Sequence, residues 1–316
     1  MDDAPRKLDL ICADFNGALT LLRGLGARLD SIFPADEPHS AMLSHDGTAI
    51  RLRARADAPA PQGPLPDFRP EFVLTSAGAE AAEGRAGMLY RDLIPSRLGG
   101  RYIASHIVIA EGGPVADWVH FHRIAVQLIC VRKGWVRVVY QDQGPPFVMH
   151  PGDMVVQPPG IRHRVLESGD GLEVVEITCP ALHETFAEHD MTLPNGSDPG
   201  GIYGGQHFLH HVAATTPWAA WNGGEAQSTR VGQATGGIAA ARIVRPGALP
   251  AIDVPPHDGE LVFGFVLEGS ARLQLGGEYP LGPGDSFAIP PEKAWRMHEA
   301  SQDFRLLHVA TARIPA

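Results

Sequence analysis

The stretch HPGDMVVQPPGIRH (150–163) recurs in altered form as GPGDSFAIPPEKAW (282–295). An earlier pair, ICVRKGWVRVVY (129–140) and GFVLEGSARLQL (264–275), repeats in the same order. Each copy alternates short runs of aliphatic and aromatic residues with turns that contain glycine or proline, a pattern typical of short antiparallel strands. The sequence therefore predicts an internal duplication of one all-β unit.

The composition of the chain agrees with many turns and few helices. Of 316 residues, 36 are glycine and 28 are proline, about 20% together against roughly 12% in average proteins. The length suggests about two domains. A net charge of -10 disfavours nucleic acid and anionic membrane surfaces as partners, because both attract basic faces.

The three cysteines, Cys12, Cys130 and Cys179, are widely spaced and form no CxxC pair. They therefore indicate neither a disulfide framework nor a zinc motif. Cys130 lies in an apolar run, which favours a buried thiol. Because the N-terminal residues also lack an apolar leader segment, we expect a cytoplasmic protein.

The pattern along the chain divides it into four parts. Residues 1–80 predict a small α/β segment, and residues 85–180 and 225–316 predict the two β units. Residues 181–224 predict a linker with connecting loops. This linker region holds five histidines, for which we expect surface or packing roles because their spacing matches no ligand template: His183, His189, His207, His210 and His211.

Within the first part, the pattern predicts a strand–helix–strand–strand order. Residues 8–13 alternate like a strand, and residues 16–30 have leucines at helical spacing. Residues 41–54 predict two strands joined at Asp46-Gly47, a strong hairpin signal.

Three histidines and a glutamine in the first β unit have a spacing that suits a metal site. His120 and His122 lie two residues apart on one strand, so alternation puts both side chains on the same face. Gln127 begins the next strand, and His163 follows the Pro-Pro-Gly turn. Imidazole suits Fe, Zn, Ni and Cu, and oxygen donors suit Mn and Fe. We expect these four side chains to converge inside one barrel around one divalent ion.

These residues resemble the two-part motif of the cupin superfamily, H-x-H-x4-[E/Q]-x6-G followed by G-x5-P-x-G-x2-H. The matching residues are His120, His122, Gln127 and Gly134 in the first part and Gly152, Pro158, Gly160 and His163 in the second. Three positions depart from the motif. Pro114 stands where glycine is usual, Gln127 where glutamate is more common, and Glu167 where asparagine often occurs.

The second β unit resembles a degraded cupin. In the same register Pro255 replaces the first histidine, Val262 the glutamine and Trp295 the last histidine, so that only His257 remains. One imidazole does not hold a divalent ion, and we therefore expect a structural copy in which Trp295 fills the space of the lost ligand. Its turn residues are retained, as turn geometry requires.

The resemblance implies a mainly β fold, with two tandem cupin (double-stranded β-helix, or jelly-roll) barrels and a small N-terminal α/β segment. That segment is similar to one half-module of the vicinal oxygen chelate (glyoxalase-like) superfamily. Leu10 stands where such modules often carry a metal ligand, so we expect no metal there. Cupins often dimerise, and a homodimer is a further expectation.

Gln127 in place of glutamate has an electrostatic consequence. Three imidazoles and an amide are neutral and leave a divalent ion its full charge, whereas a carboxylate ligand would reduce that charge by one. The more positive ion is a stronger Lewis acid and prefers a small anionic, chelating substrate. Alternatively, Gln127 lies behind the ligands, and three histidines alone hold the ion.

The resemblance implies two kinds of enzyme. Three-histidine cupins include Fe(II) ring-cleaving dioxygenases of the gentisate type, which favours an Fe(II) dioxygenase that acts on a hydroxylated aromatic acid or a diketone. Other cupins with three histidines and a glutamine are isomerases or lyases of sugar acids, and hydrolase chemistry is a related alternative. A non-catalytic metal-binding or ligand-binding protein is the third alternative, and Mn, Ni or Zn are alternatives to Fe(II).

Three further residues are candidates for contact with the substrate or the ligands. Glu167 shares the predicted ligand face of its strand with His163, and it would act as a general base or orient a ligand histidine. His106 and Tyr140 lie on neighbouring strands. A shift of one residue would turn any of these side chains to the opposite face.

Overall fold

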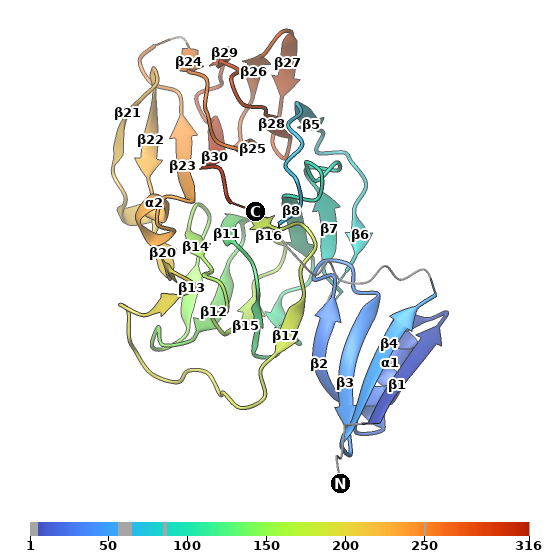
Figure 1. Cartoon of the computed structure of the whole chain (residues 1–316). Coiled ribbons are helices and arrows are strands. Elements are labelled where there is room, and N and C mark those ends of the chain that lie inside the picture. The colour runs from blue at the N-terminus through green and yellow to red at the C-terminus, as the bar shows by residue number, and fades with distance from the viewer. Residues whose placement is uncertain (1–5, 56–64, 85–86, 250, 316) are drawn as a thin grey trace.

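A computed structural model describes residues 6–55, 65–84, 87–249 and 251–315 of the chain. Figure 1 shows an N-terminal α/β module and two barrels, one above the other in this view. The fold is mainly β and contains two cupin-type jelly rolls, which confirms the predicted fold class.

The N-terminal module has one strand more than the sequence pattern predicts. It consists of β1 (Arg6–Cys12), α1 (Phe15–Gly24), β2 (Arg28–Phe33), β3 (Ser40–His45) and β4 (Thr48–Ala54). The predicted helix over 16–30 was too long. Asp14 caps its start by accepting a hydrogen bond from the N–H of Gly17 (2.9 Å), and it ends before Gly26, whose φ of +93° suits glycine.

The leucine spacing misled the prediction because Leu29 belongs to β2 and packs beneath the helix. The hairpin between β3 and β4 is confirmed. Asp46 and Gly47 both have positive φ, 45° and 73°, as a two-residue hairpin turn demands.

The sheet of this module continues into the first barrel. Its strands follow the order β1-β4-β3-β2, and β2 pairs with β17 (Thr185–Ala187). β17 in turn pairs with β10 (His120–His122), which carries the first two candidate ligands. The module is therefore joined by backbone hydrogen bonds to the strand at the candidate site.

The other strands of the first barrel belong to two sheets. They are β6 (Ala82–Glu83), β7 (Leu89–Asp92), β8 (Ile103–Ile109), β9 (Gly113–Pro114), β11 (Val126–Lys133), β12 (Val136–Tyr140), β13 (Phe147–Met149), β14 (Met154–Val156), β15 (His163–Ser168), β16 (Leu172–Cys179) and β20 (Leu209–His211). A separate hairpin, β18 (Ile202–Tyr203) and β19 (Gln206–His207), lies in the connection to the second barrel.

The second barrel repeats this plan after the short helix η2 (Ala213–Thr215), and another short helix, α2 (Val231–Ala234), lies between its second and third strands. Its strands are β21 (Trp218–Trp221), β22 (Gly224–Ser228), β23 (Ala239–Arg245), β24 (Ala251–Val254), β25 (Val262–Glu268), β26 (Ala271–Gln274), β27 (Glu278–Leu281), β28 (Ser286–Ile289), β29 (Trp295–His298) and β30 (Arg305–Thr311).

The main sheets of the two barrels have the same strand order and exchange their end strands. The first sheet reads β20-β14-β11-β16-β8-β7-β6, and the second reads β5-β28-β25-β30-β23-β22-β21. The end strand β5 (Val73–Thr75) precedes the first barrel in the chain but pairs with the second. β20 directly precedes the second barrel but pairs with the first. Each barrel therefore receives a strand from the segment that leads into the other.

The aspartates of the two Pro-Gly-Asp turns hold these exchanged segments. A carboxylate oxygen of Asp153 accepts a hydrogen bond from the N–H of Ala213 (2.9 Å), just after β20. Asp285 accepts one from Ala77 (2.7 Å), just after β5. Each aspartate also accepts a hydrogen bond from a backbone N–H in its own turn. The aspartate is present in both copies, and in each it holds its own turn and the exchanged strand β20 or β5.

The two barrels pack through the outer faces of their main sheets. Leu128 and Ile177 on one side meet a shared apolar cluster with Phe263 and Val309 on the other. Separate clusters fill the interior of each barrel and the N-terminal module. Cys130 lies in the shared cluster, and burial raises the pKa of its thiol to about 12, which confirms the predicted buried cysteine.

A buried ion pair closes the same interface. The guanidinium of Arg101 donates to both carboxylate oxygens of Glu260 (2.9 and 2.8 Å), and the hydroxyl of Tyr102 donates to the same group (2.8 Å). Because all three residues are buried, removal of one partner would leave an uncompensated polar group.

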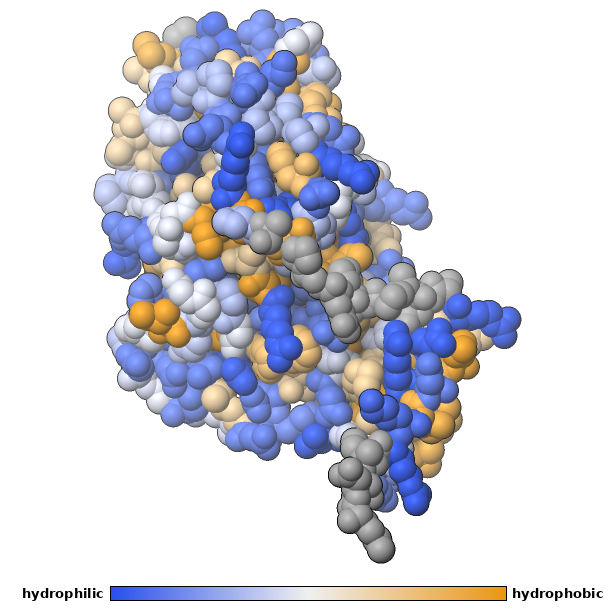
Figure 2. All heavy atoms as spheres, in the orientation of Figure 1, coloured by the Kyte–Doolittle hydropathy of each residue, from blue (hydrophilic) through white to orange (hydrophobic). Residues whose placement is uncertain are grey.

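The surface is mostly hydrophilic on the face that Figure 2 shows. Hydrophobic residues are also visible at the edge of the N-terminal module, where Leu8 and Ile11 of β1 are 46% and 56% exposed. No helix in the described part of the chain is long and apolar enough to span a membrane.

Candidate metal centre

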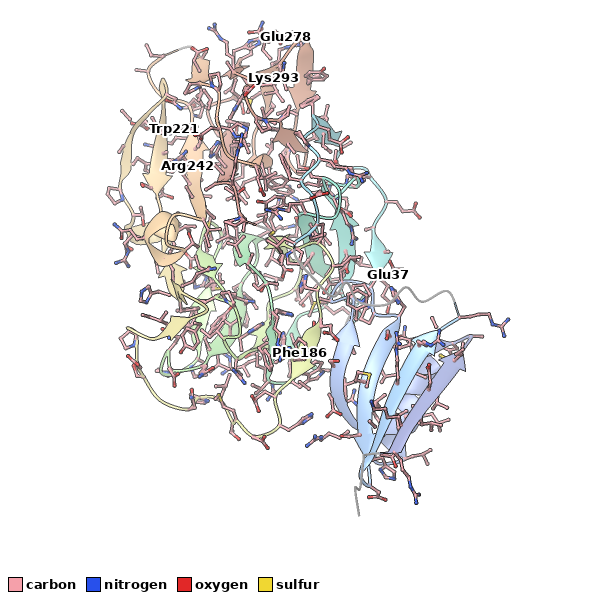
Figure 3. The ribbon with its side chains drawn as sticks, viewed as in Figure 1. Glu37, Phe186, Trp221, Arg242, Glu278 and Lys293 are labelled. Atoms are coloured by element: carbon pink, nitrogen blue, oxygen red, sulfur yellow. The ribbon has the colours of Figure 1, made fainter. Side chains whose placement is uncertain are left out.

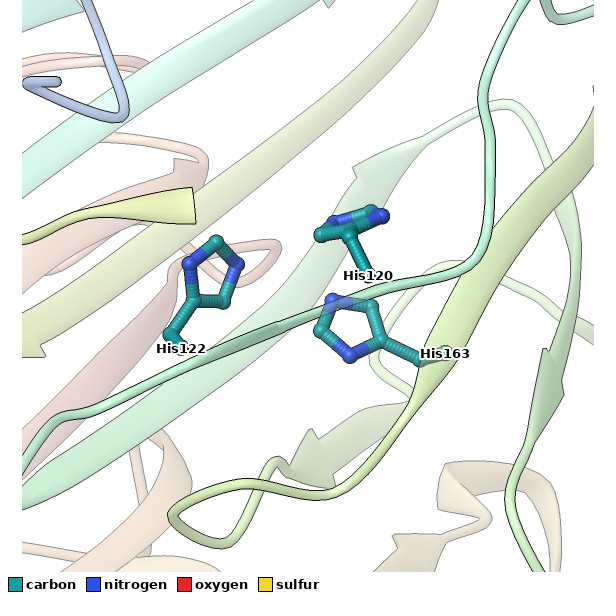
Figure 4. Close-up of side chains that lie close together, drawn as sticks. All are labelled: His120, His122 and His163. Carbon is teal, nitrogen blue, oxygen red and sulfur yellow. The ribbon is translucent and has the colours of Figure 1, made fainter. Parts of the chain in front are cut away.

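The structure brings the three predicted histidine ligands together. His120 and His122 lie on β10, and His163 begins the neighbouring β15, directly opposite His120. One ring nitrogen from each histidine lies within 4.8 Å of the other two, and all three side chains are buried. Figure 4 shows the three rings facing one another from two strands. Such an arrangement suits one divalent ion.

Backbone carbonyls orient the three rings. The Nδ1 of His120 lies 2.7 Å from the carbonyl oxygen of Trp118, that of His163 lies 3.1 Å from Ile161, and that of His122 lies 3.2 Å from Glu184. Because a carbonyl oxygen only accepts, each Nδ1 carries the hydrogen. Each Nε2 therefore keeps a lone pair that a metal could accept. Histidine ligands commonly show this arrangement, in which the other ring nitrogen donates to a carbonyl or carboxylate.

A carboxylate supports the first of these rings. Asp117 is buried, and its Oδ1 lies 3.5 Å from the Nδ1 of His120. Its other oxygen accepts a hydrogen bond from the N–H of Val165 (2.9 Å) on β15. Asp117 thus links the strands that carry the ligands.

Gln127 is buried beside the triad, next to a second glutamine that the sequence reasoning missed. The Nε2 of Gln157 donates to the Oε1 of Gln127 (2.9 Å) and to the Nε2 of His163 (3.2 Å). The lone pairs of Gln127 and His163 therefore point at one common donor. This arrangement fits the metal cation that the cupin motif implies, because the ligands of one cation direct their lone pairs at the same point. Gln157 directly follows β14 and lies beside Gln127 of the neighbouring strand. In the sequence, only its position at the end of an apolar run indicated that its side chain is buried.

Tyr140, one of the predicted site residues, reaches the same cluster. Its hydroxyl donates to the Oε1 of Gln157, and its ring lies 5.5 Å from that of His163. Burial, with the negative charges of Glu176 and Asp117, raises the pKa of this hydroxyl far above its usual value. Tyr140 therefore stays a hydrogen-bond donor at neutral pH.

The triad lines a cavity of about 90 Å³ inside the first barrel. Most of the wall is aliphatic, including Ile107, Ile129 and Val174. Glu176 also lines the cavity, and the sequence reasoning overlooked it. The signal was present, because Leu172, Val174 and Glu176 alternate on one strand. The cavity is small: about 150 Å³ accommodates benzene.

His106 does not belong to this site, and its prediction as a site residue was wrong. Its Nε2 pairs with a carboxylate oxygen of Glu173 (2.9 Å), and Arg91 lies 3.3 Å from its Nδ1. Its ring also lies 5.6 Å from that of Phe265 in the second barrel. Burial and the charge of Arg91 lower its pKa. Ile107, one residue later, lines the cavity instead, so the facing was off by one residue.

Glu167 also lies outside the cavity, and its predicted role was wrong. Its carboxylate pairs with Arg137 (2.9 Å) at the surface, where its side chain is 37% exposed. The ladder between β12 and β15 shifts by one residue between Val165 and Glu167. This bulge turns Glu167 outward although Val165 faces inward.

Two of the linker histidines pack against neighbouring rings. His183 is buried against His122, with ring centroids 5.2 Å apart, and burial lowers its pKa. His210 stacks on Phe147 at 4.4 Å. None of the five belongs to the one metal-type cluster found among the described residues.

The second barrel keeps the ladder but not the ligands. Val254, one residue before the predicted Pro255, lies opposite Trp295, as His120 lies opposite His163. Trp295 is buried in the barrel core beside Phe287, as predicted.

Comparison with known proteins agrees with this geometry. A model of the cupin domain family matches residues 243–310, which lie in the barrel without the ligands. No curated protein sequence matches the chain. Among solved structures, oxalate decarboxylase from Bacillus subtilis is similar with a TM-score of 0.56 at 12% identity, covering 81% of this chain and 78% of that one. Residues 243–310 match the cupin domain family, and the chain as a whole shares the two-barrel fold of this structure.

A second similar structure is the protein YlbA from E. coli, with a TM-score of 0.56 at 11% identity. The match covers 80% of this chain and 95% of YlbA. At such identities the likeness shows the bicupin fold alone, and the chemistry of this cupin has to be argued from its own cavity.

Proposed function

We propose that this bicupin is a metal-dependent enzyme whose first barrel acts on a small, anionic, chelating molecule, with Fe(II) dioxygenase chemistry as the leading assignment. One observation carries the proposal: one ring nitrogen from each of His120, His122 and His163 lies within 4.8 Å of the other two, in the wall of a small, mostly apolar cavity.

The donor set favours this class of substrate. His120, His122 and His163 would hold the ion, with Gln127 either as a fourth ligand or behind them. All four groups are neutral, so a bound divalent ion keeps its full charge and attracts an anionic chelator. When bound, Fe(II) supplies sites for substrate and O₂, and both oxygen atoms enter the product.

The cavity restricts the size of that substrate. About 90 Å³ is less than the roughly 150 Å³ that holds benzene. A short diketone or hydroxy acid therefore suits the site better than a hydroxylated aromatic acid. The aliphatic walls exclude water, and Tyr140 and Gln157 provide a hydrogen-bonded polar edge beside His163.

A lyase or isomerase is the second candidate, and Glu176 is the observation that favours it. A carboxylate in the cavity provides a proton acceptor for removal of a proton next to a metal-bound carbonyl. A non-catalytic metal-binding or ligand-binding cupin is the third candidate, and it shares the same site.

Oxygen consumption distinguishes these candidates. Protein reconstituted anaerobically with Fe(II) would be mixed with a 1,3-diketone, a short 2-hydroxy acid or a hydroxylated aromatic acid in an oxygen electrode. We expect O₂ uptake equal to substrate consumed for one of the two small classes, and none for His122→Ala. Substrate conversion without O₂ uptake would replace the dioxygenase assignment with the lyase or isomerase one.

A further inference from the structure

Two arginines on β23 of the second barrel stack on tryptophans but differ in their charge partners. The guanidinium carbon of Arg245 lies 4.1 Å from the ring centre of Trp218, and a nitrogen of the same group pairs with the carboxylate of Glu225 (2.7 Å). The guanidinium carbon of Arg242 lies 4.8 Å from the ring centre of Trp221 (Figure 3). Arg242 has no ion pair with any residue that the structure describes. It is therefore a cation without a counter-charge.

Arg242 lies on the inner wall of the second barrel. Val244, two residues later on β23, belongs to the core of this barrel, and alternation turns Arg242 to the same face. The ladder places Arg242 opposite His308 on β30. Leu306, two residues before His308, also belongs to the barrel core. Both polar side chains therefore face the barrel interior, where solvent reaches a charge poorly.

His308 holds one side of the guanidinium. Its Nδ1 lies 3.4 Å from the Nη1 of Arg242, and because a guanidinium only donates, this Nδ1 accepts and the ring hydrogen is on Nε2. Burial lowers the pKa of the imidazole to about 3, so it is neutral at pH 7. The Nε2 of His308 and the Nε1 of Trp295, which stacks on it at 5.9 Å, are buried without an acceptor among the described residues. This wall thus presents hydrogen-bond donors.

The guanidinium of Arg242 is covered on one face and accessible elsewhere. Trp221 covers the face, and His308 accepts from one nitrogen. The other nitrogens have no acceptor among the described residues and are not fully enclosed. Burial lowers the pKa of Arg242, and no carboxylate raises it again. Because a partly buried charge is stabilised by a counter-charge, this group should attract an anion from solution.

We propose that the second barrel binds a small monocarboxylate anion at Arg242, at a site separate from the histidine triad. A planar guanidinium matches a carboxylate through two parallel hydrogen bonds. Trp221 and His308 hold the guanidinium in place before the anion arrives, so less side-chain entropy is lost on binding. The bound anion stabilises the folded chain by linkage. This inference does not depend on the proposed function, because it concerns the other barrel.

Acetate is the probe, and calorimetry on the full chain measures its dissociation constant. Binding at a metal is excluded by the use of the double variant His120→Ala, His163→Ala beside wild-type protein treated with chelator. We expect one acetate per chain in both proteins, and an unfolding temperature that rises with acetate concentration. No binding of acetate by either protein would overturn the proposal.

Variants of the two stacked arginines locate the site. Arg242→Gln should weaken acetate binding at least about tenfold and abolish the rise in unfolding temperature, because the charge-assisted pair is lost. Arg245→Gln is the matched control, because it removes a tryptophan-stacked arginine of the same strand that already has a carboxylate partner. It should bind acetate as the wild type does. Full affinity in Arg242→Gln, or an equal loss in Arg245→Gln, would overturn the role of Arg242.

Two further measurements keep the proposal falsifiable. If Arg242→Gln does not fold, Arg242→Lys replaces it: this variant keeps the positive charge but not the paired donors, and it should also bind acetate more weakly. Inorganic phosphate, at the same ionic strength, should bind more weakly than acetate, because one guanidinium does not balance a dianion at a partly buried site. Phosphate binding as tight as that of acetate would overturn the assignment of a carboxylate site.

Discussion

The two barrels have the same backbone plan but different interiors. In the first barrel Gln127 lies beside Gln157, and both amides face the histidine cluster. In the second, Val262 pairs with Ile289 at the same rungs of the ladder. An apolar pair has thus taken the place of a polar pair without any change in strand order.

The difference between His163 and Trp295 has the largest consequence for the interior. His163 borders a cavity of about 90 Å³, whereas Trp295 packs against Phe287 within a filled apolar core. The backbone plan depends on turns and ladders, and the interior side chains are free to specialise for binding or for packing. One barrel of this protein is suited to chemistry and the other to stability.

Metal content gives the sharpest test of this comparison. Wild-type protein purified without chelator should hold about one divalent ion per chain, and the double variant His120→Ala, His163→Ala should hold almost none, because two of three ligands are lost. The double variant His257→Ala, His298→Ala, in the second barrel, is the control and should keep the full amount. Elemental analysis measures both, and metal loss in the control variant would break the comparison.

The packed interior should be the more sensitive to truncation. Trp295→Ala removes a large side chain from a filled core and should cost about 3–5 kcal/mol of unfolding free energy. His163→Ala, measured by urea unfolding in the presence of chelator, should cost less because that residue already borders a cavity. Equal losses would show that the two interiors are packed alike.

Acid should affect the second barrel through His308. Burial, with the charge of Arg242, lowers the pKa of this imidazole to about 3, while the unfolded residue titrates near 6.5. Between these values the unfolded state binds a proton that the folded state does not. The free energy of unfolding should therefore fall by about 1.4 kcal/mol for each pH unit below about 6, through this group alone.

Figure 3 shows Arg242 beside Trp221, and His308 lies 5.2 Å from that indole ring. The variant His308→Leu should show a shallower loss of stability between pH 6 and pH 4, in urea titrations of chelated protein. Identical slopes for variant and wild type would contradict the buried neutral imidazole. The first barrel is the same in both proteins, so its contribution cancels in the difference.

Local patterns predicted the features that depend on neighbours in the sequence. The hairpin at Asp46-Gly47 and the H-x-H pair required only turn chemistry and strand alternation. The helix over 16–30 was predicted too long, because the spacing of Leu22, Leu25 and Leu29 extends a helical pattern across a glycine turn. Alternation also failed at Glu167, because a bulge in β15 reverses the facing and leaves no mark in the sequence.

The sequence by itself determined the duplicated unit, its turns and the candidate ligand set His120, His122 and His163, because each depends on short-range spacing. Tertiary structure alone decided which polar groups surround that set. Gln157 and Glu176 reach the cavity only through the pairing of β11 with its two neighbours. It also decided that β5 and β20 cross between the barrels, since strand pairing over long separations depends on which sheet edges the packed barrels present.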